Sequence, residues 1–329
     1  MINPNAKLAP NLFDKDKVEQ RLVRDGFGDG LLEASEENKN VVALCADLGD
    51  STRAQWIAKK FPERYIEVGI GEQNMASLAA GMAAAGKVPF IASYAMFSPG
   101  RNWEQVRTAI CYNDTNVKIA GAHAGVSVGP DGATHQAIED IALTRILPRM
   151  TVVVPCDYHE AKKTTLAFAR MKGPAYFRYP REKNPVITTQ DTPFTIGKAE
   201  VFREGKDVSV FACGPLLYNA LVAAEELATE GIDVEVINNH TIKPLDKDTI
   251  IASAQKTHAV VTVEEHAIAG GMGGAIAEVL VQQVPVPMEF IGVHDRFGET
   301  GEPTELIEAF GMGISHIKEA IKKVLLRKK

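Results

Sequence analysis

The sequence predicts an α/β protein with two domains, each a mostly parallel sheet with helices on both faces. Short apolar segments alternate with helix-like segments along most of the chain, which is typical of parallel strands connected by helices. Three prolines and many polar residues interrupt this alternation once, at residues 180–193, which we interpret as a linker. The length of 329 residues also suits about two domains. We therefore predict domains over residues 1–190 and 191–329.

The expected elements follow from runs of β-branched and apolar residues and from helical spacing of apolar residues. In the first domain we expect strands at residues 41–45, 65–68, 88–93, 117–121, 151–154 and 175–178. Its helices are expected at residues 21–34, 76–86, 104–111 and 159–171. In the second domain we expect strands at 208–212, 233–238, 260–264 and 288–293, and helices at 220–230, 274–283 and 314–326.

The composition excludes several classes of protein. A net charge of −6 provides no global basic field that would attract nucleic acid. No apolar run reaches the length of a membrane span, and residues 1–17 are polar with no signal-peptide core. The four cysteines are far apart and form no CxxC or zinc spacing, so we expect buried thiols in a reducing cytoplasm.

The segment at residues 68–75, VGIGEQNM, contains the most informative carboxyl group of the chain. A β-rich run enters a glycine turn there, and a run of small residues leaves it as a helix. Glu72 is thereby placed at a helix N-terminus, where it can contact a ligand in a cleft. The alternative is an acid that only complements the helix dipole, an effect worth under ~1 kcal/mol.

Three further segments follow predicted strands: residues 46–51, 93–97 and 122–136. The carboxyl ends of parallel strands are where open α/β sheets bind ligands. The third segment is rich in glycine, contains two histidines and an aspartate, and lacks the Gly-Lys-Ser/Thr ending of a P-loop. Its histidine spacing does not suit zinc and no cysteine is near, so no metal site is expected on this chain.

A second glycine-rich loop, GGMGG at residues 270–274, also follows a strand and opens a helix. It comes late in its domain, and no strand-end acid stands at the distance that a dinucleotide site needs. We therefore expect close packing here rather than nucleotide binding.

The run from Gly69 through Gln136, which ends in GPDGATHQ, resembles the pyrimidine-binding domain of transketolases. The resemblance continues through NNHTIKPLD at residues 238–246 and EEHAIAGGMGG at residues 264–274, and covers nearly the whole chain. Deoxyxylulose-phosphate synthases share much of the histidine-bearing ending but tend to have an arginine where His123 stands. The β subunits of 2-oxo acid dehydrogenases lack this loop pattern, so the resemblance favours a transketolase.

A complete transketolase also has an N-terminal half with a Gly-Asp-Gly motif for thiamine diphosphate. Gly28-Asp29-Gly30 lies inside a predicted helix with no matching asparagine, and we interpret it as coincidental. The resemblance thus implies the carboxyl-terminal half of a split transketolase. The partner chain would carry the diphosphate domain and its Mg²⁺ or Ca²⁺ ion. The small-sided helix at residues 76–86 suggests a homodimer of this chain within a heterotetramer.

The resemblance also implies roles around the cofactor. Glu72 matches the catalytic glutamate that hydrogen-bonds to the aminopyrimidine ring, for which its carboxyl must be protonated or share a proton. Tyr94 and Phe97 match aromatic residues beside that ring, although ordinary core packing is an alternative for both. Asp47 matches an acid near the cofactor and the subunit boundary.

The implied substrates are phosphosugars, between which a two-carbon ketol unit is transferred reversibly, as in the pentose phosphate pathway. Asp131 matches the residue that contacts the acceptor's C2 hydroxyl, and His135 matches a catalytic histidine near the donor's hydroxyls. The positions that match the phosphate site are Arg24, Ser51, His123 and Arg181. Arg178 competes with Arg181 for that role. A scaffold protein that kept only the fold is a further alternative, against which the presence of Glu72 argues.

Overall fold

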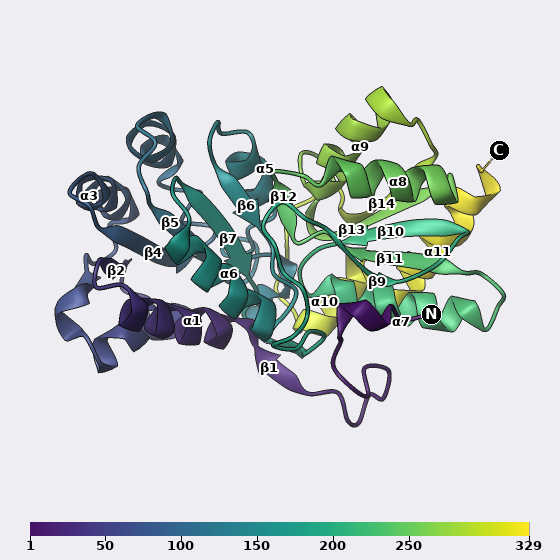
Figure 1. Ribbon diagram of the computed structural model, residues 1–329, viewed down its shortest axis with the longest axis horizontal. Coiled ribbons are helices and arrows are strands. Elements are labelled where there is room, and N and C mark those ends of the chain that lie inside the picture. The colour runs from purple at the N-terminus through teal and green to yellow at the C-terminus, as the bar shows by residue number, and fades with distance from the viewer. Residues whose placement is uncertain (329) are drawn as a thin grey trace.

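The computed structural model describes residues 1–328 and arranges their strands in a seven-stranded, a five-stranded and a two-stranded sheet (Figure 1). The strands of the first sheet are, in order, β12 (Thr241–Lys243), β6 (Thr151–Val153), β7 (Ala175–Tyr179), β5 (Lys118–Ala122), β4 (Val88–Tyr94), β2 (Val41–Cys45) and β3 (Tyr65–Glu67). The strands of the second sheet are β14 (Met288–Val293), β13 (Val260–Ala267), β10 (Val208–Ala212), β11 (Val234–Asn238) and β9 (Glu200–Arg203).

Both large sheets are mostly parallel, which confirms the predicted fold class. The exceptions are edge strands: β12 is antiparallel to β6, and β9 is antiparallel to β11. The two-stranded sheet pairs β1 (Gln20–Leu22) with β8 (Lys183–Pro185) in antiparallel register. These four short strands were not predicted, because three or four residues at an edge contain no extended apolar run.

Helices α1 (Val23–Glu37) and α6 (Tyr158–Arg170) cover one face of the first sheet and pack closely against each other. A Cβ atom on Gly30 would lie 2.8 Å from Thr165 Cβ, so close approach of the two helices requires glycine there. Gly28 lies against Trp56 in the same way, at 2.6 Å. The Gly-Asp-Gly sequence is therefore helical, as predicted, and its glycines have a packing reason.

The opposite face of the first sheet is covered by α3 (Glu72–Ala84), the π-helix η4 (Val106–Tyr112) and α5 (Asp140–Arg145). The short α4 (Trp103–Gln105) leads into η4, where the sequence predicts one continuous helix. The remaining helical segments of this part of the chain are short turns. These are α2 (Gly49–Thr52), η1 (Pro4–Ala6), η2 (Ala54–Lys59), η3 (Pro62–Arg64) and η5 (Val126–Asp131).

The second sheet also lies between two helical layers. One face packs against α7 (Leu216–Ala228), α10 (Pro303–Ala309) and α11 (Ile314–Leu326), through a core that includes Val210 and Val261. The other face packs against α8 (Lys247–Thr257) and α9 (Met272–Gln283). The core on this second face is continuous with that of the first sheet, since Val152 and Phe211 belong to one cluster.

Segments of each predicted domain reach the sheet of the other. Strand β12 joins the first sheet, and near the N-terminus Ile2 bridges Arg203 at the edge of the second. The expected linker is packed rather than free, because the Asp157 carboxylate accepts the backbone N–H groups of Ile187 and Thr188 at 2.8 and 2.5 Å. The ranges 1–190 and 191–329 stay a prediction.

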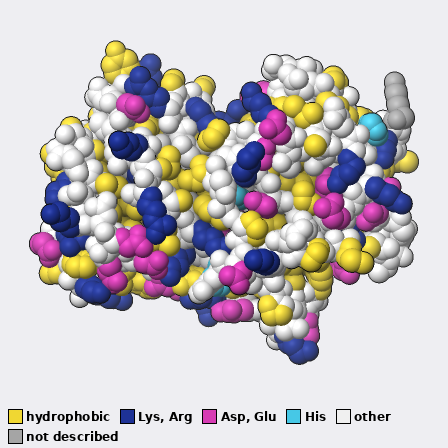
Figure 2. Space-filling model, in the orientation of Figure 1, with side chains coloured by type: hydrophobic (Ala, Val, Ile, Leu, Met, Phe, Trp, Pro, Cys, Tyr) yellow, Lys and Arg dark blue, Asp and Glu magenta, His cyan; other side chains and the backbone are white. Residues whose placement is uncertain are grey.

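The surface and the cysteines fit the expectations from composition. All four cysteines are buried and free, as predicted. Basic and acidic side chains are interspersed over the face drawn in Figure 2. Within residues 1–328, no helix combines the length and the apolar character that crossing a membrane requires.

Candidate functional site

The predicted site residues come from neighbouring strand ends of the first sheet. Ser51 follows β2, Tyr94 ends β4, His123 follows β5 and Arg181 lies just beyond β7. These strands are adjacent in the order β7-β5-β4-β2, so their carboxyl ends converge at one edge. That edge is where open parallel sheets bind ligands.

Four aromatic rings from two of these segments form a cluster. Tyr94 stacks on His123 with ring centroids 4.1 Å apart, and lies 6.3 Å from Phe97 in a stacked arrangement. His135 meets the edge of Phe97 at 5.4 Å. The structure therefore brings together the aromatic and histidine residues that the sequence analysis took from separate motifs.

Glu72 lies at the start of α3, as predicted, and its side chain is only 1% exposed. A glycine turn with Gly69 at φ +67° leads the chain into this helix. The Oε2 atom of Glu72 accepts a hydrogen bond from Arg101 at 2.7 Å, whereas Oε1 has only a 3.5 Å contact from Ser93 Oγ. The Asn102 side chain donates to the Glu72 backbone carbonyl and fixes the start of the helix.

Sequence reasoning missed Arg101. Its guanidinium also lies 4.8 Å from the ring centroid of Phe97, so it connects the carboxyl of Glu72 to the aromatic cluster. The available signal was its spacing: Arg101 follows Phe97 by four residues, and its backbone N–H donates to the Phe97 carbonyl, as in one helical turn.

Arg24, Ser51 and His123 also meet, although they lie far apart in the sequence. Arg24 Nη1 donates to the Ser51 carbonyl at 3.2 Å and lies 3.3 Å from His123 Nε2. A guanidinium can only donate, so Nε2 accepts and the ring proton of His123 is on Nδ1. Burial, with the nearby Arg24 charge, lowers the pKa of His123 to about 3, so the ring is neutral at pH 7.

We call the meeting point of Arg24, Ser51 and His123 the Arg24–His123 corner. It has two buried hydrogen-bond donors without a partner among residues 1–328: His123 Nδ1 and Arg24 Nε. Buried polar atoms are rarely left unpaired without a reason. Both are donors, and an oxyanion supplies acceptors only, so the pair suits an anionic oxygen ligand.

Of the two arginines in FRYPR (residues 177–181), only Arg181 is partly exposed to solvent. It is half-buried, and Nη1 donates to Asp131 Oδ1 at 3.2 Å and to the Val128 carbonyl at 3.0 Å. Arg178 is 5% exposed and directs its guanidinium at Asp140 and at the Glu265 carbonyl. The geometry therefore suits Arg181 better than Arg178 for contact with a ligand.

Asp47 is the predicted residue that the structure leaves apart. It is exposed after β2 with φ +59°, and its backbone N–H donates to the Glu67 carboxylate at 2.7 Å. No contact among residues 1–328 connects its side chain to the aromatic cluster. Its expected role at the cofactor and subunit boundary stays a prediction.

The side chains fit the pyrimidine ring that the resemblance implies. A ring with nitrogen acceptors and an amino group needs flat apolar walls and a carboxyl partner. Tyr94 and Phe97 would supply the walls, and Glu72 Oε1, the carboxyl oxygen without a close donor, would be the partner. No group of three or more His, Cys, Asp or Glu side chains within residues 1–328 could hold a metal ion. The fit of these residues to the cofactor therefore concerns its pyrimidine ring.

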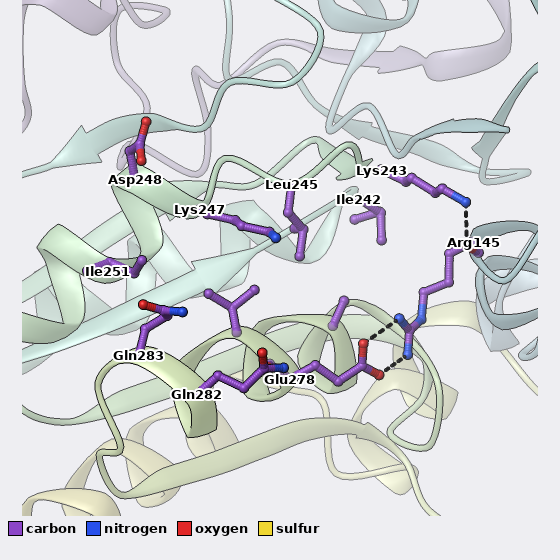
Figure 3. A pocket seen from close by; sticks show the side chains of 12 residues that line it. Arg145, Ile242, Lys243, Leu245, Lys247, Asp248, Ile251, Glu278, Gln282 and Gln283 are labelled. Atoms are coloured by element: carbon purple, nitrogen blue, oxygen red, sulfur yellow. Dashed lines mark hydrogen bonds and ion pairs between the residues drawn. The ribbon is translucent and has the colours of Figure 1, made fainter. Parts of the chain in front are cut away.

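A groove with a volume of about 560 Å³ lies elsewhere, between β12, α8 and α9 (Figure 3). Some of its polar side chains are already paired: Arg145 bonds Glu278 at 2.7 Å, and Lys243 donates to the Arg145 carbonyl at 3.0 Å. None of the predicted site residues lines it.

Comparison with known proteins agrees with this arrangement over both halves of the chain. Residues 19–186 match the family model "Transketolase, pyrimidine binding domain", and residues 197–317 match "Transketolase, C-terminal domain". A putative transketolase C-terminal section from Methanocaldococcus jannaschii is 41% identical and covers 91% of this chain and 95% of its own length. A 6-deoxy-6-sulfo-D-fructose transketolase subunit from a Clostridium species is 40% identical, with 95% and 97% covered.

A solved structure described as a split gene transketolase, an inactive beta4 tetramer, is 42% identical with a TM-score of 0.88. The match covers 94% of this chain and 99% of that one. Longer transketolases match over about half their length, 49% for the human protein. With both of its domains matched, the chain belongs to the transketolase family, as a subunit that carries the pyrimidine-binding and C-terminal domains.

Proposed function

We propose that this chain is one subunit of a split transketolase, which transfers a two-carbon ketol unit reversibly from a ketose phosphate to an aldose phosphate. The observation that carries the proposal is the convergence of Glu72, the Tyr94–Phe97 stack and the Arg24–His123 corner at one sheet edge. A second chain would supply the diphosphate domain and its Mg²⁺ or Ca²⁺ ion. The reaction would belong to the pentose phosphate pathway in the cytoplasm.

Thiamine diphosphate, when bound, supplies the carbon nucleophile and the electron sink for such a transfer. The residues of this chain would orient its pyrimidine ring. Tyr94 and Phe97 would stack on the ring, and Glu72 would hold on Oε1 the proton that it shares with a ring nitrogen. Arg101, on Oε2, would keep the carboxyl in place.

The sugar would lie along the histidine-bearing loop. Asp131 would contact the acceptor's C2 hydroxyl, and His135, whose Nδ1 is 2.9 Å from the Thr134 hydroxyl, would contact the donor's hydroxyls. The phosphate would be held by donors from four segments, namely Arg24, Ser51, His123 and Arg181. The two unpartnered donors of this corner support that assignment. Because His123 is neutral, it would contribute a hydrogen bond rather than a charge.

The assembly would be a homodimer of this chain flanked by two copies of the partner. Helix α3 supports this: Ser77, Gly81 and Ala84 are exposed, and no atom lies within 4 Å of a Cβ built on Gly81. Small exposed side chains allow close approach of a second backbone. The relative described as inactive in its β4 form supports the expectation that this chain alone is inactive too.

The test is reconstitution. The purified chain is assayed alone and with a candidate N-terminal subunit, for thiamine diphosphate binding by calorimetry and for ketol transfer from ketose phosphates. We expect weak binding and no transfer from the chain alone, and recovery of both on mixing. A monomeric chain with full transfer activity would contradict the proposal.

Donor screening separates the remaining enzymatic alternative. A deoxyxylulose-phosphate-synthase-like or 2-oxo acid dehydrogenase β-like subunit would consume pyruvate or another 2-oxo acid instead of a ketose phosphate. Deoxyxylulose-phosphate synthases match this chain at lower identity than the two transketolase relatives of similar length: 34% for the enzyme of Desulfitobacterium hafniense, against 41% and 40%. A sulfonated ketose belongs in the same screen, because one relative is described as acting on a sulfo-sugar and the donor-rich corner could hold either anion.

A further inference from the structure

We infer that the C-terminal domain holds the histidine-bearing loop in shape, and that Glu265 is a positioning residue in this role. The histidine loop is defined here as residues 122–136. Glu265 lies on β13 of the second sheet and is 7% exposed. Its Oε1 atom accepts the backbone N–H of Ser127 at 2.6 Å, across 138 residues of sequence.

The histidine loop needs an external support because its own backbone is irregular. Three of its glycines, Gly125, Gly129 and Gly132, have φ angles of +89°, +77° and +73°, and the turn η5 is kinked at Gly129. Glycine-rich backbone loses more conformational freedom on ordering than other backbone, so contacts from outside must offset that cost.

Glu265 is built closely into the loop. A Cβ atom on Gly125 would lie 2.3 Å from Glu265 Oε1, so any other residue at this position would displace the carboxylate. The bond to Ser127 has an ionisable acceptor, and charge-assisted hydrogen bonds are about twice as strong as neutral ones. Arg178 binds the Glu265 backbone carbonyl and the side chain of Asp140, which anchors this part of β13 to the first domain.

A second contact holds the far end of the loop. Gln136 Nε2 donates to the carbonyl of Val126 at 2.9 Å and to that of Glu299 at 2.9 Å. It thus connects the C-terminal end of the loop with the start of η5 and with the C-terminal domain. The segment at residues 298–303 covers the loop between these points, with Pro303 against Gly129 and Thr300 against Gly132. Helix α10, which begins at Pro303, packs against η5.

The functional consequence rests on the proposed function, which places His123, Asp131 and His135 against the sugar. All three belong to the histidine loop, and His123 directly follows β5. Movement of Ser127 would displace all three relative to Glu72 and Arg24, which are held by the first domain alone. The C-terminal domain would then act on catalysis through the shape of the loop, without contacting the substrate.

The experiment measures the loop first and the activity second. Amide hydrogen exchange of residues 122–136 is compared in the wild-type chain, Glu265→Ala and Glu265→Gln. The matched control is Glu264→Gln, at an equally buried acid on the same strand that bonds α9 instead. We expect exchange of the loop at least about ten-fold faster in Glu265→Ala, intermediate in Glu265→Gln, and unchanged in the control.

In the reconstituted enzyme, we expect Glu265→Ala to lower kcat/KM about ten-fold or more for phosphorylated sugars, with partial recovery in Glu265→Gln. Loop exchange equal to wild type in both Glu265 variants would overturn the inference, even if activity falls. Failure of the proposed function has a different signature, in which the loop exchange rises as expected but the wild-type assembly transfers no ketol unit. If Glu265→Ala does not fold, Glu265→Gln alone decides, because the amide keeps the size of the side chain.

Discussion

The chain has two glycine-rich loops that follow parallel strands, the histidine loop and the GGMGG loop at residues 270–274, and adjacent glutamates of β13 hold them. Glu264 accepts the backbone N–H groups of Met272 and Gly273, at 2.7 and 2.8 Å, and so closes the N-terminus of α9 within its own domain. Glu265 reaches instead into the other domain, to Ser127. The GGMGG loop is thereby closed by a carboxylate of its own domain, whereas the histidine loop is shaped but left open.

This difference teaches that glycine content does not distinguish a binding loop from a packing loop. An anion at the GGMGG loop would need the amides that Glu264 already occupies, and a Cβ on Gly271 would lie 2.3 Å from the same carboxylate. The histidine loop, by contrast, contains one donor without a partner within residues 1–328, His123 Nδ1, and contacts Arg24, which has another. The distinguishing feature of the histidine loop is that two unpartnered donors, Arg24 Nε and His123 Nδ1, lie together there.

The largest expected effect concerns Glu72, beside the aromatic cluster. Glu72→Gln should lower turnover of the reconstituted enzyme by about 10²–10⁴, because positioned proton transfer contributes that much, while the fold stays intact. Exchange of the thiazolium proton, followed by NMR, should slow in parallel. Glu104→Gln, at an exposed acid, is the control. Exchange at the unmutated rate in Glu72→Gln would show that this carboxyl has another role.

A substitution at the GGMGG loop should lower the stability of the chain and leave its activity unchanged. Glu264→Ala leaves two buried amides without an acceptor, which should lower the free energy of unfolding by about 2–4 kcal/mol. Denaturant unfolding of the isolated chain measures this loss. The folded fraction should still transfer ketol units once the partner is added. A loss of activity without a loss of stability would break the distinction between the two loops.

A smaller effect is expected for His123, which belongs to the histidine loop, and for Arg181, which bonds that loop at Val128 and Asp131. His123→Ala and Arg181→Ala should each raise KM for phosphorylated sugars by about 10- to 100-fold with little change in kcat, because each removes a bond to a group that stays bound throughout. Unphosphorylated sugars serve as the control and should be affected much less. Equal losses for both kinds of sugar would remove these residues from the phosphate site.

Much of this arrangement could be predicted where the determinants are local. Short local stretches of sequence are enough to predict the long apolar strands and the helix that begins at Glu72. The edge strands β1, β8, β9 and β12 were missed because their pairing depends on distant partners. Strand β12 shows this best, since it follows β11 in sequence but joins the other sheet.

The site follows the same rule. Strand ends and the resemblance were enough to nominate Tyr94, Phe97, His123 and His135, which the structure assembles into one cluster. Glu265 could not be assigned a role, because its partner Ser127 lies 138 residues away and no local pattern encodes that contact.

The smallest expected effect compares two buried histidines, His123 beside Arg24 and His240 beside Phe194, each of which has one ring nitrogen without a partner within residues 1–328. Burial lowers the pKa of both His123 and His240 to about 3, so each stays neutral in the folded chain at pH values where an unfolded histidine is protonated. Below the unfolded pKa of about 6.5, the unfolded state therefore binds more protons, and stability falls as the pH falls, by about 1.4 kcal/mol per pH unit for each histidine. His240 stacks on Phe194 at 4.5 Å and bonds the Thr241 hydroxyl.

Unfolding of the isolated chain between about pH 6 and pH 4 measures these contributions. We expect His123→Gln and His240→Gln each to flatten the pH dependence by about one proton relative to wild type. Added inorganic phosphate should flatten the contribution of His123 only, because a bound anion favours a protonated imidazole and offsets the cost of burying its charge. The His240→Gln variant should therefore respond to phosphate, whereas His123→Gln should not. Identical responses of both variants would mean that the corner formed by Arg24 and His123 is as closed as the GGMGG loop.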